Sequence, residues 1–369
     1  MATFWVNLLD MGSFSYGDSI FINHPDVRIL IDGGYAGLAT GSHDSPSIPS
    51  QLQAILRQEP PFELDLLVVT HCHADHIGAL PRLVEQGILQ PRWALVADPD
   101  LGFGPFEERI LPDAPSHHLM AVALREEPHG FLPDAQLLDF LYDAVSLEER
   151  YREMLARLDD GPTRVFRYGR DDLRDLENHF RPLGLEILGP TREHLRLCAR
   201  QLREILADGM RRMGEPGIVL PDGPLSPSEQ VRLYRRLVSP DPTDAVLAID
   251  ASGKGAALNC QSLVLLFEAD GAKALLTGDM QLADPNVPGL DDPMARLLED
   301  LAERAPFDLL KTPHHSSFNG LDDAVYRALP AAIYGHTGGR GSDHHPSRRV
   351  LRLLEAQRAN LDWVRTDRN

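Results

Sequence analysis

A chain of 369 residues has room for one large domain or two small ones, and its 43% hydrophobic and 25% charged residues are ordinary for a folded protein, which excludes a disordered or fibrous chain. The 55 acidic residues outnumber the 36 basic ones and give a net charge of −19, so the overall field disfavours the coating of nucleic acid or of an anionic membrane. The 3 cysteines form no disulfide framework, the apolar runs are too short to span a bilayer, and the N-terminal segment lacks the pattern of a signal peptide. These features predict a cytoplasmic protein without membrane contact.

The N-terminal part of the chain has the pattern of a sheet. Short apolar or alternating runs predict strands over residues 4–9, 19–23 and 27–31. Helical spacing follows over residues 48–57. Residues 64–70 form a continuous apolar run, which is typical of a strand buried on both faces, and helical spacing returns over residues 77–86.

The composition changes between about residues 99 and 239, where Glu and Arg residues are frequent and helical periodicity dominates. Helices are predicted over residues 135–158, 192–213 and 226–238, and one short strand over residues 185–188. The last helix begins with Ser226-Pro227-Ser228-Glu229, which is a helix-start pattern. The middle is therefore expected to be two helical insertions, residues 99–163 and 192–250, around one strand, and these insertions are candidates for a lid or for the surface that binds a protein partner.

Strand patterns return in the C-terminal part. Strands are predicted over residues 245–249, 262–268, 274–277, 309–312 and 331–334, with a final helix over residues 347–359. Ala269-Asp270-Gly271-Ala272 joins two of these strands and is a hairpin signal. Strands that alternate with helices and end in polar residues predict a layered α/β fold with its site at one edge of the sheets. No second domain is required, so residues 1–369 are expected to form a single domain.

Candidate metal ligands follow the apolar run that ends at Thr70. His71 and His73 are two residues apart in a loop, so both side chains can reach one ion. Asp75 and His76 follow at the expected start of a helix and can reach a second ion nearby. A polar loop of solvated histidines is the alternative, but the spacing HxHxDH directly after a strand favours metal binding. Imidazole-rich ligands favour zinc, with manganese or iron as alternatives.

Two later strand ends add to this set. Asp279, in the turn that begins with Gly278, suits a carboxylate that bridges two metals and holds a hydroxide between them. Of the pair His314-His315, one is expected to complete the second metal's shell and the other to contact substrate or to donate a proton. We assign His314 to the metal and His315 to the substrate, and the reverse assignment stays open. Lys311 is expected to be solvated, as strand lysines commonly are.

These motifs, in this order, resemble the metallo-β-lactamase superfamily and, more finely, the ComEC-type hydrolase domain of competence DNA-uptake channels, here without channel segments. Segments 8–12 with 17–19, 31–34, 259–265, 310–317, 345–346 and 365–367 resemble that group's LDVGQGDS, IDGG, NxxSLVL, LKVPHHGS, HP and RTD. Many superfamily members carry a further histidine in the region where this chain has Asn259. The resemblance therefore implies a thinner ligand shell for the first metal.

The resemblance implies a four-layered αββα sandwich with helical insertions, and a metal-dependent hydrolase in which Asp75 and Asp279 are catalytic. The substrate class it favours is a phosphodiester, such as a short single-stranded nucleic acid or a nucleotide, because the net charge disfavours an enzyme that lines a long DNA groove. Asn259, Ser316 and Ser317 are the expected contacts to the remaining substrate oxygens. His345 is expected to act as a general acid or to contact the anion.

Other interpretations of the same residues remain. A hydroxide held by the same two metals can also attack a carbonyl, so a hydrolase of small esters, lactones or thioesters is the second candidate. A non-catalytic module that binds a protein partner is the third. Asp32, in a turn after a strand, either hydrogen-bonds a metal-ligating histidine or caps the turn.

Overall fold

The computed structural model describes residues 4–12, 17–103, 115–126, 130, 132–213, 224–238, 255–340, 345–357 and 359–368. The strand expected over residues 245–249 lies outside these ranges, as do parts of both expected insertions.

The first of two six-stranded sheets takes its strands in chain order. They are β1 (Trp5–Leu8), β2 (Ile20–His24), β3 (Val27–Ile31), β4 (Phe62–Val69), β5 (Leu89–Ala97) and β6 (Arg164–Tyr168). β1 to β3 pair antiparallel, whereas β3 to β6 run parallel. Parallel strands end at a common edge of their sheet, so the loop after β4 lies at that edge.

The second sheet repeats this arrangement: its strands also lie side by side in chain order, with the antiparallel strands first in the chain. Its strands are β7 (Leu185–Gly189), β8 (Val264–Ala269), β9 (Ala272–Leu276), β10 (Phe307–Lys311), β11 (Ala331–His336) and β12 (Asp362–Arg365). β7 to β9 pair antiparallel and β9 to β12 run parallel. The predicted hairpin is confirmed, because Asp270 and Gly271 between β8 and β9 have the positive φ angles, 55° and 81°, of a type I′ turn.

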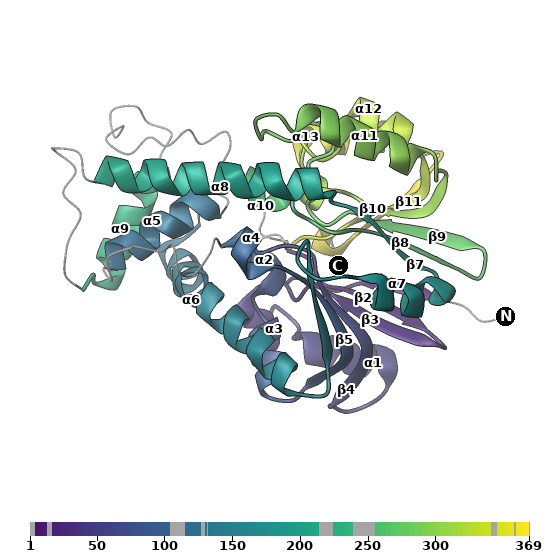
Figure 1. Cartoon of the computed structure of the whole chain (residues 1–369), viewed down its shortest axis with the longest axis horizontal. Helices are drawn as coiled ribbons and strands as arrows, with labels where there is room; N and C mark the ends of the chain where they lie inside the picture. Colours follow the sequence, from purple (N-terminus) through teal and green to yellow (C-terminus); the bar gives the residue numbers. More distant parts are fainter. Residues whose placement is uncertain are drawn as a thin grey trace.

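The two sheets pack face to face, with helices on their outer faces (Figure 1). Alternate apolar residues of both sheets, such as Ile22, Leu66 and Leu265, form the buried layer between them. The outer helices are η1 (Ala36–Ala39), α1 (Ile48–Leu56), α2 (Ala74–Ile77), α3 (Leu80–Glu85), α11 (Asp291–Ala302), α12 (Asp323–Ala328) and α13 (Arg348–Ala356). α7 (Arg174–Phe180) and η3 (Arg181–Leu183) carry the chain from one sheet to the other. The expected α/β sandwich is thereby confirmed.

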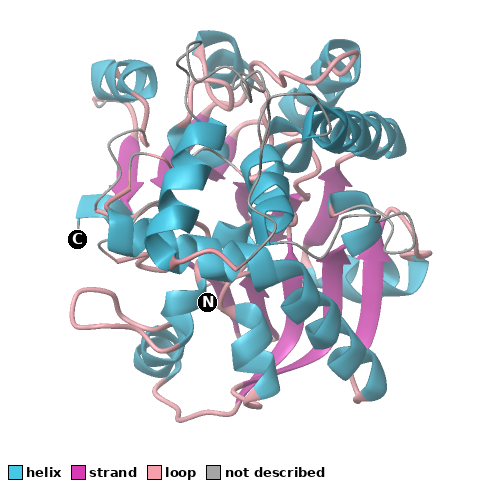
Figure 2. Cartoon of the chain, turned by 90° about the vertical axis from the view of Figure 1, so that its left-hand side faces the viewer, coloured by secondary structure: helices cyan, strands magenta, loops and turns pink. Residues whose placement is uncertain are grey.

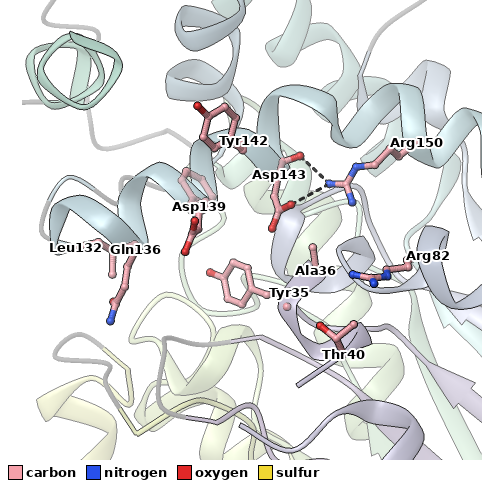
Figure 3. A pocket seen from close by; sticks show the side chains of 12 residues that line it. Tyr35, Ala36, Thr40, Arg82, Leu132, Gln136, Asp139, Tyr142, Asp143 and Arg150 are labelled. Carbon is pink, nitrogen blue, oxygen red and sulfur yellow. Dashed lines mark hydrogen bonds and ion pairs between the residues drawn. The ribbon is translucent and has the colours of Figure 1, made fainter. Parts of the chain in front are cut away.

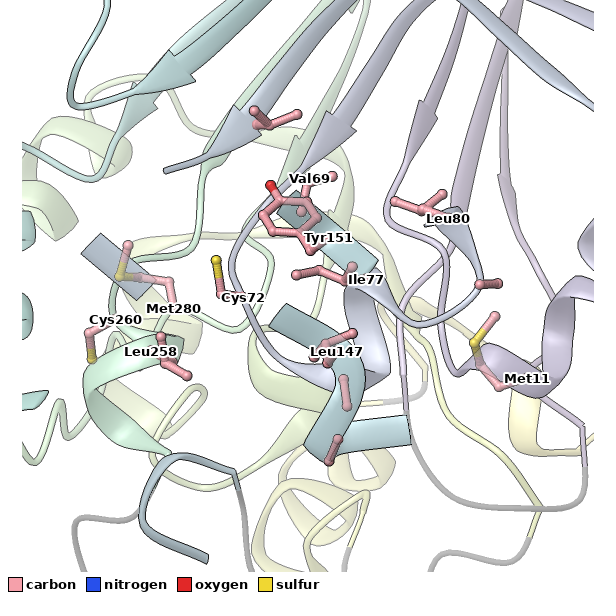
Figure 4. Close-up of a cluster of buried hydrophobic side chains, with 14 of the residues drawn as sticks. Met11, Val69, Cys72, Ile77, Leu80, Leu147, Tyr151, Leu258, Cys260 and Met280 are labelled. Atoms are coloured by element: carbon pink, nitrogen blue, oxygen red, sulfur yellow. The ribbon is translucent and has the colours of Figure 1, made fainter. Parts of the chain in front are cut away.

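Further helices form a group at one end of the sandwich (Figures 1 and 2). They are α4 (Pro99–Gly102), α5 (Pro115–Arg125), α6 (Asp134–Asp160), α8 (Arg192–Met213), α9 (Pro227–Val238) and α10 (Ala256–Asn259). α5 packs against α6, α8 and α9. Leu147 and Tyr151 of α6 lie beside Ile77 and Cys72 in the buried cluster behind the loop after β4 (Figure 4). This group of helices therefore shares a core with the sandwich.

Several sequence expectations need correction. The prediction of one strand in the middle of the chain was wrong, because β6 and β7 both lie there and belong to different sheets. β5 was not predicted because Pro91 and Arg92 interrupt its apolar run, and β12 was not predicted because it is short and only partly buried. In the part of the chain that is described, no helix combines the length and the apolar character that a membrane span requires.

Candidate metal centre

The loop after β4 is fastened from behind by Asp32, which follows β3. Its carboxylate accepts hydrogen bonds from the backbone N–H of Thr70 at 2.8 Å and from the Thr70 hydroxyl at 2.7 Å. The same carboxylate lies 2.8 Å from Nδ1 of His76. Asp32 therefore holds the loop in place and orients the His76 ring, which is the first of the two roles expected for it.

Four buried side chains from both sheets converge in front of this loop. Asp75 and His76 come from α2, Asp279 follows β9, and His315 follows β10; one ligand atom from each lies within 4.8 Å of all the others. Nε2 of His315 lies 2.8 Å from Oδ2 of Asp279 and 3.1 Å from Oδ2 of Asp75. Nε2 of His76 lies 3.2 Å from the same oxygen of Asp279. Two imidazoles and two carboxylates thus form one group.

A second pair of imidazoles adjoins this group. Nε2 of His71 lies 3.0 Å from Nδ1 of His73, and the ring centroids of His71 and His76 are 4.1 Å apart. The Ser262 hydroxyl connects the two sets, because it accepts from the N–H of Asp279 at 2.9 Å and lies 3.2 Å from Nδ1 of His71. His71 and His73 therefore form a pair of imidazoles next to this group.

The surroundings of these rings fit metal ligands. Each of the four imidazoles has one nitrogen against an oxygen outside the cluster and the other turned into it. The outer oxygens are Ser262 Oγ for His71, the Arg125 carbonyl at 3.2 Å for His73, Asp32 for His76, and the Thr337 carbonyl at 3.3 Å for His315. Outer hydrogen bonds of this kind orient metal-bound histidines.

One inward-facing atom supports this fit directly. Nε2 of His76 is buried and makes no well-aligned hydrogen bond within the described part of the chain, although Oδ2 of Asp279 lies 3.2 Å away. A cation placed among these atoms would satisfy both the nitrogen and the carboxylates around it. Nitrogen and carboxylate donors together suit zinc, manganese or iron.

Lys311 occupies a position that the sequence did not indicate. The expectation of a solvated lysine was wrong, since its side chain is fully buried. Nζ forms an ion pair with Asp18, donates to the Gly278 carbonyl at 3.0 Å and lies 3.3 Å from Oδ1 of Asp279. The Thr337 hydroxyl also donates to Asp18. This lysine therefore fixes the turn that carries Asp279.

The buried charges stabilise one another. Burial alone would raise the pKa of Asp279, but His315, His76 and Lys311 together hold that pKa well below its usual value. Burial alone would lower the pKa of His315, whereas Asp279 and Asp18 raise it well above the usual value. The carboxylate of Asp279 is thus held in its ionised form.

His314 lies outside the cluster and is held by two amides. Nε2 lies 3.0 Å from Nδ2 of Asn259, and Nδ1 lies 2.7 Å from Oδ1 of Asn319. The turn from Pro313 brings His315, rather than His314, to Asp279. His314, His315 and Ser316 have positive φ angles of 49°, 46° and 62°, a strained conformation for residues other than glycine. No glycine of this chain marks the turn, although Ser316 stands where the motif LKVPHHGS has a glycine.

The remaining expected substrate contacts lie around this turn. Oγ of Ser316 faces Nδ1 of His336 at 2.9 Å and the Thr312 hydroxyl at 2.7 Å, so it is engaged away from the cluster. Ser317 is buried, and its N–H donates to the His314 carbonyl at 2.7 Å. The ring of His345 lies beside the histidine pair, 5.6 Å from the centroid of His314 and 6.0 Å from that of His315.

Comparison with known proteins agrees with this geometry. The profile of the metallo-beta-lactamase superfamily matches residues 12–135, which include the HxHxDH segment. No curated protein matches the chain. The two mixed sheets with outer helices form a sandwich of the metallo-β-lactamase type, and the His and Asp cluster at its edge could hold metal. That superfamily is generally hydrolytic and typically binds divalent metals.

Proposed function

We propose that this protein is a metal-dependent phosphodiesterase that cleaves short single-stranded nucleic acid or nucleotides. The observation that carries the proposal is the adjoining of two ligand sets. His71 and His73 form one, and the second consists of Asp75, His76, Asp279 and His315. Two cations a few ångströms apart suit in-line displacement at phosphorus, because one can stabilise the attacking oxygen and the other the leaving oxygen.

The residues around these two sets have different roles in the proposed reaction. When bound, divalent cations supply Lewis-acid activation of water and of the anionic substrate oxygen. Asp279 belongs to the second set and is linked to His71 of the first through the Ser262 hydroxyl, and Lys311 holds its carboxylate in place. His345 is placed beside His315, where it can give a proton to the leaving oxygen or bind the anion.

One property of the sequence supports a phosphodiester over a carbonyl substrate, and a second limits the length of that phosphodiester. The motifs from residue 8 to residue 367 follow the order of the ComEC-type hydrolase domain, whose resemblance implies nucleic acid cleavage. The net charge of −19 repels a long polyanion, which favours a short strand or a nucleotide held at the metals.

The test is turnover of bis(p-nitrophenyl) phosphate and of a short single-stranded DNA by protein loaded with zinc or with manganese. We expect cleavage that EDTA abolishes, and loss of activity in Asp279→Ala and in the double variant His71→Ala/His73→Ala. His43→Ala is the matched control, because the His43 side chain is fully exposed, and it should keep full activity.

Metal content, measured by mass spectrometry on the same samples, separates loss of ions from loss of chemistry. Cleavage of lactones or thioesters without cleavage of either phosphodiester would overturn the proposal in favour of the second candidate.

A further inference from the structure

A cavity of about 410 Å³ lies between α6 and the segment of the sandwich that follows Gly34 and leads into η1 (Figure 3). Its volume falls in the range of roughly 300–1,000 Å³ that small-molecule sites occupy. Tyr35, which directly precedes η1, faces α6, and Phe140 of α6 adds a second aromatic ring to the wall. None of the residues that line this cavity belongs to the candidate metal centre.

The polar groups of the wall narrow the chemistry of an occupant. Asp139 and Asp143 stand one helical turn apart on α6 and face the side from which Tyr35 projects (Figure 3). Arg150 lies 3.5 Å from the Asp143 carboxylate, and Arg82 is the other cation of the wall. Two carboxylates and two guanidinium groups leave the wall without net charge, which disfavours an organic cation or an anion. Aromatic faces with polar groups at the side suit a flat, neutral ring whose edge carries N–H donors and acceptors.

Both walls of this cavity are connected to the candidate metal centre by short runs of the chain and by hydrogen bonds. On the core side, Tyr35 is three residues after Asp32, whose carboxylate contacts His76. The intervening N–H groups of Gly33 and Gly34 donate to the carbonyls of His76, at 2.6 Å, and of Asp18, at 2.8 Å.

The wall formed by α6 is connected through a different pair of contacts. Asp143 precedes Ala144, whose carbonyl accepts from the Arg125 guanidinium at 3.2 Å. The carbonyl of Arg125 in turn lies 3.2 Å from Nε2 of His73. The cavity and both ligand sets are thus connected through two chains of contacts, one on each wall of the cavity, as a reacting centre and a pocket for the adjoining part of its substrate should be.

We propose that this cavity binds a nucleobase of the substrate, which stacks on Tyr35 and donates an edge N–H to Asp139. This assignment rests on the proposed phosphodiesterase activity and names the part of the substrate that α6 would select. Bases stack on aromatic side chains, and a carboxylate acceptor adds preference for bases with N–H donors at the edge.

The experiment measures binding of nucleosides, which carry no phosphate, to the full-length metal-loaded protein by isothermal titration calorimetry. Adenosine, guanosine, cytidine and thymidine are titrated separately. At least one should bind with a stoichiometry of one, and Tyr35→Leu and Asp139→Asn should each weaken its Kd by about tenfold, which corresponds to about 1.4 kcal/mol. Tyr35→Phe keeps the ring and should stay within about twofold of the wild type.

Matched controls guard against general effects on folding. Asp160→Asn changes an exposed aspartate at the far end of the same helix, and Tyr326→Leu removes a half-buried tyrosine of α12, away from the cavity. Neither should change the Kd. Failure of all four nucleosides to bind, equal Kd values for wild type, Tyr35→Leu and Asp139→Asn, or preferential binding of benzyltrimethylammonium would each overturn the proposal.

The result is separable from the proposed function. Turnover of bis(p-nitrophenyl) phosphate without nucleoside binding would overturn the base site alone. Nucleoside binding with the expected response of the variants, but without cleavage of any phosphodiester, would support the base site and overturn the phosphodiesterase.

Discussion

Lys311 provides the sharpest test of the structural argument, because it is a buried cation whose partners come from distant parts of the chain. Its Nζ pairs with Asp18 and Asp279 and donates to the Gly278 carbonyl at 3.0 Å. Lys311→Met keeps the length of the side chain and removes the charge. The substitution leaves the buried carboxylate of Asp18 without its ammonium partner and with only the His315 ring, at 3.4 Å, as a cationic neighbour; breaking one side of a buried ion pair costs ~3–5 kcal/mol.

The neighbouring strand offers a matched control. Nζ of Lys273 lies 4.0 Å from the carboxylate of Glu268, and the two side chains are 34% and 52% exposed. An exposed pair of this kind contributes at most about 1 kcal/mol, so Lys273→Met should lower the free energy of unfolding far less than Lys311→Met does.

A double-mutant cycle measures the coupling itself. Asp18→Asn alone leaves Lys311 without its nearest carboxylate, so each single variant should be strongly destabilised. The double variant should be more stable than the sum of the two losses predicts, by about 2–3 kcal/mol. The free energies come from urea titrations followed by tryptophan fluorescence, with EDTA present so that bound cations do not contribute.

Additive losses within about 0.5 kcal/mol would show that Lys311 and Asp18 do not interact in the folded protein. Equal destabilisation by Lys311→Met and Lys273→Met would likewise refute the burial of the lysine. Either result would remove the basis for the role of Lys311 in holding Asp279.

The other predictions concern the metal ligands, a buried carboxyl and two turns. His315→Ala should lose about one bound cation per chain by mass spectrometry, whereas His314→Ala, whose ring is held by two amides, should keep both; equal metal content would contradict this assignment. Burial raises the pKa of Asp143 to about 6, so the stability it contributes is present below its ordinary pKa and is lost as the pH rises through about 6. In urea titrations from about pH 4 to about pH 7, the free energy of unfolding of the wild type should fall by about 1–2 kcal/mol relative to that of Asp143→Asn. The change is smaller than the full pKa shift implies, because the side chain is 33% exposed. A difference between the two proteins that does not change with pH would argue against this pKa. Gly184→Ala places a Cβ 2.0 Å from a carbonyl oxygen of β8 and should cost more than about 2 kcal/mol, whereas Gly271→Ala has open space and should cost about 1 kcal/mol of backbone strain; equal unfolding midpoints would be inconsistent with the two turns.

The sequence predicted the parts of the fold and site that depend on local patterns. The apolar run before His71 identified β4, because a strand buried on both faces needs apolar residues throughout. The positive φ angles at Asp270 and Gly271 follow from residue types that tolerate them. β6 was missed because it is an edge strand in which Arg164 covers the ring of Trp93, so its burial depends on a side chain from another strand.

The unpredicted parts of the site depend on contacts between distant segments. Lys311 ends a strand and looks solvated until its partner, Asp18, is brought to it from the start of the chain. The contribution of Arg125 is a backbone carbonyl, which no side-chain pattern indicates. The sequence pattern led us to assign His314 to the metal, whereas the geometry favours His315, because the backbone between residues 314 and 316 turns through an unusual conformation.

The origin of the four converging ligands has a consequence for how the protein acquires activity. Asp75 and His76 belong to the first sheet's half of the chain, whereas Asp279 and His315 belong to the second. Neither half alone carries the complete set, so a nascent chain cannot assemble this cluster until both sheets have been made and have docked. Any cation held there would link the two halves and strengthen their docking by its binding free energy. Capture of a cation by all four side chains would therefore follow the docking of the two sheets, and partly made or misassembled copies would lack this site.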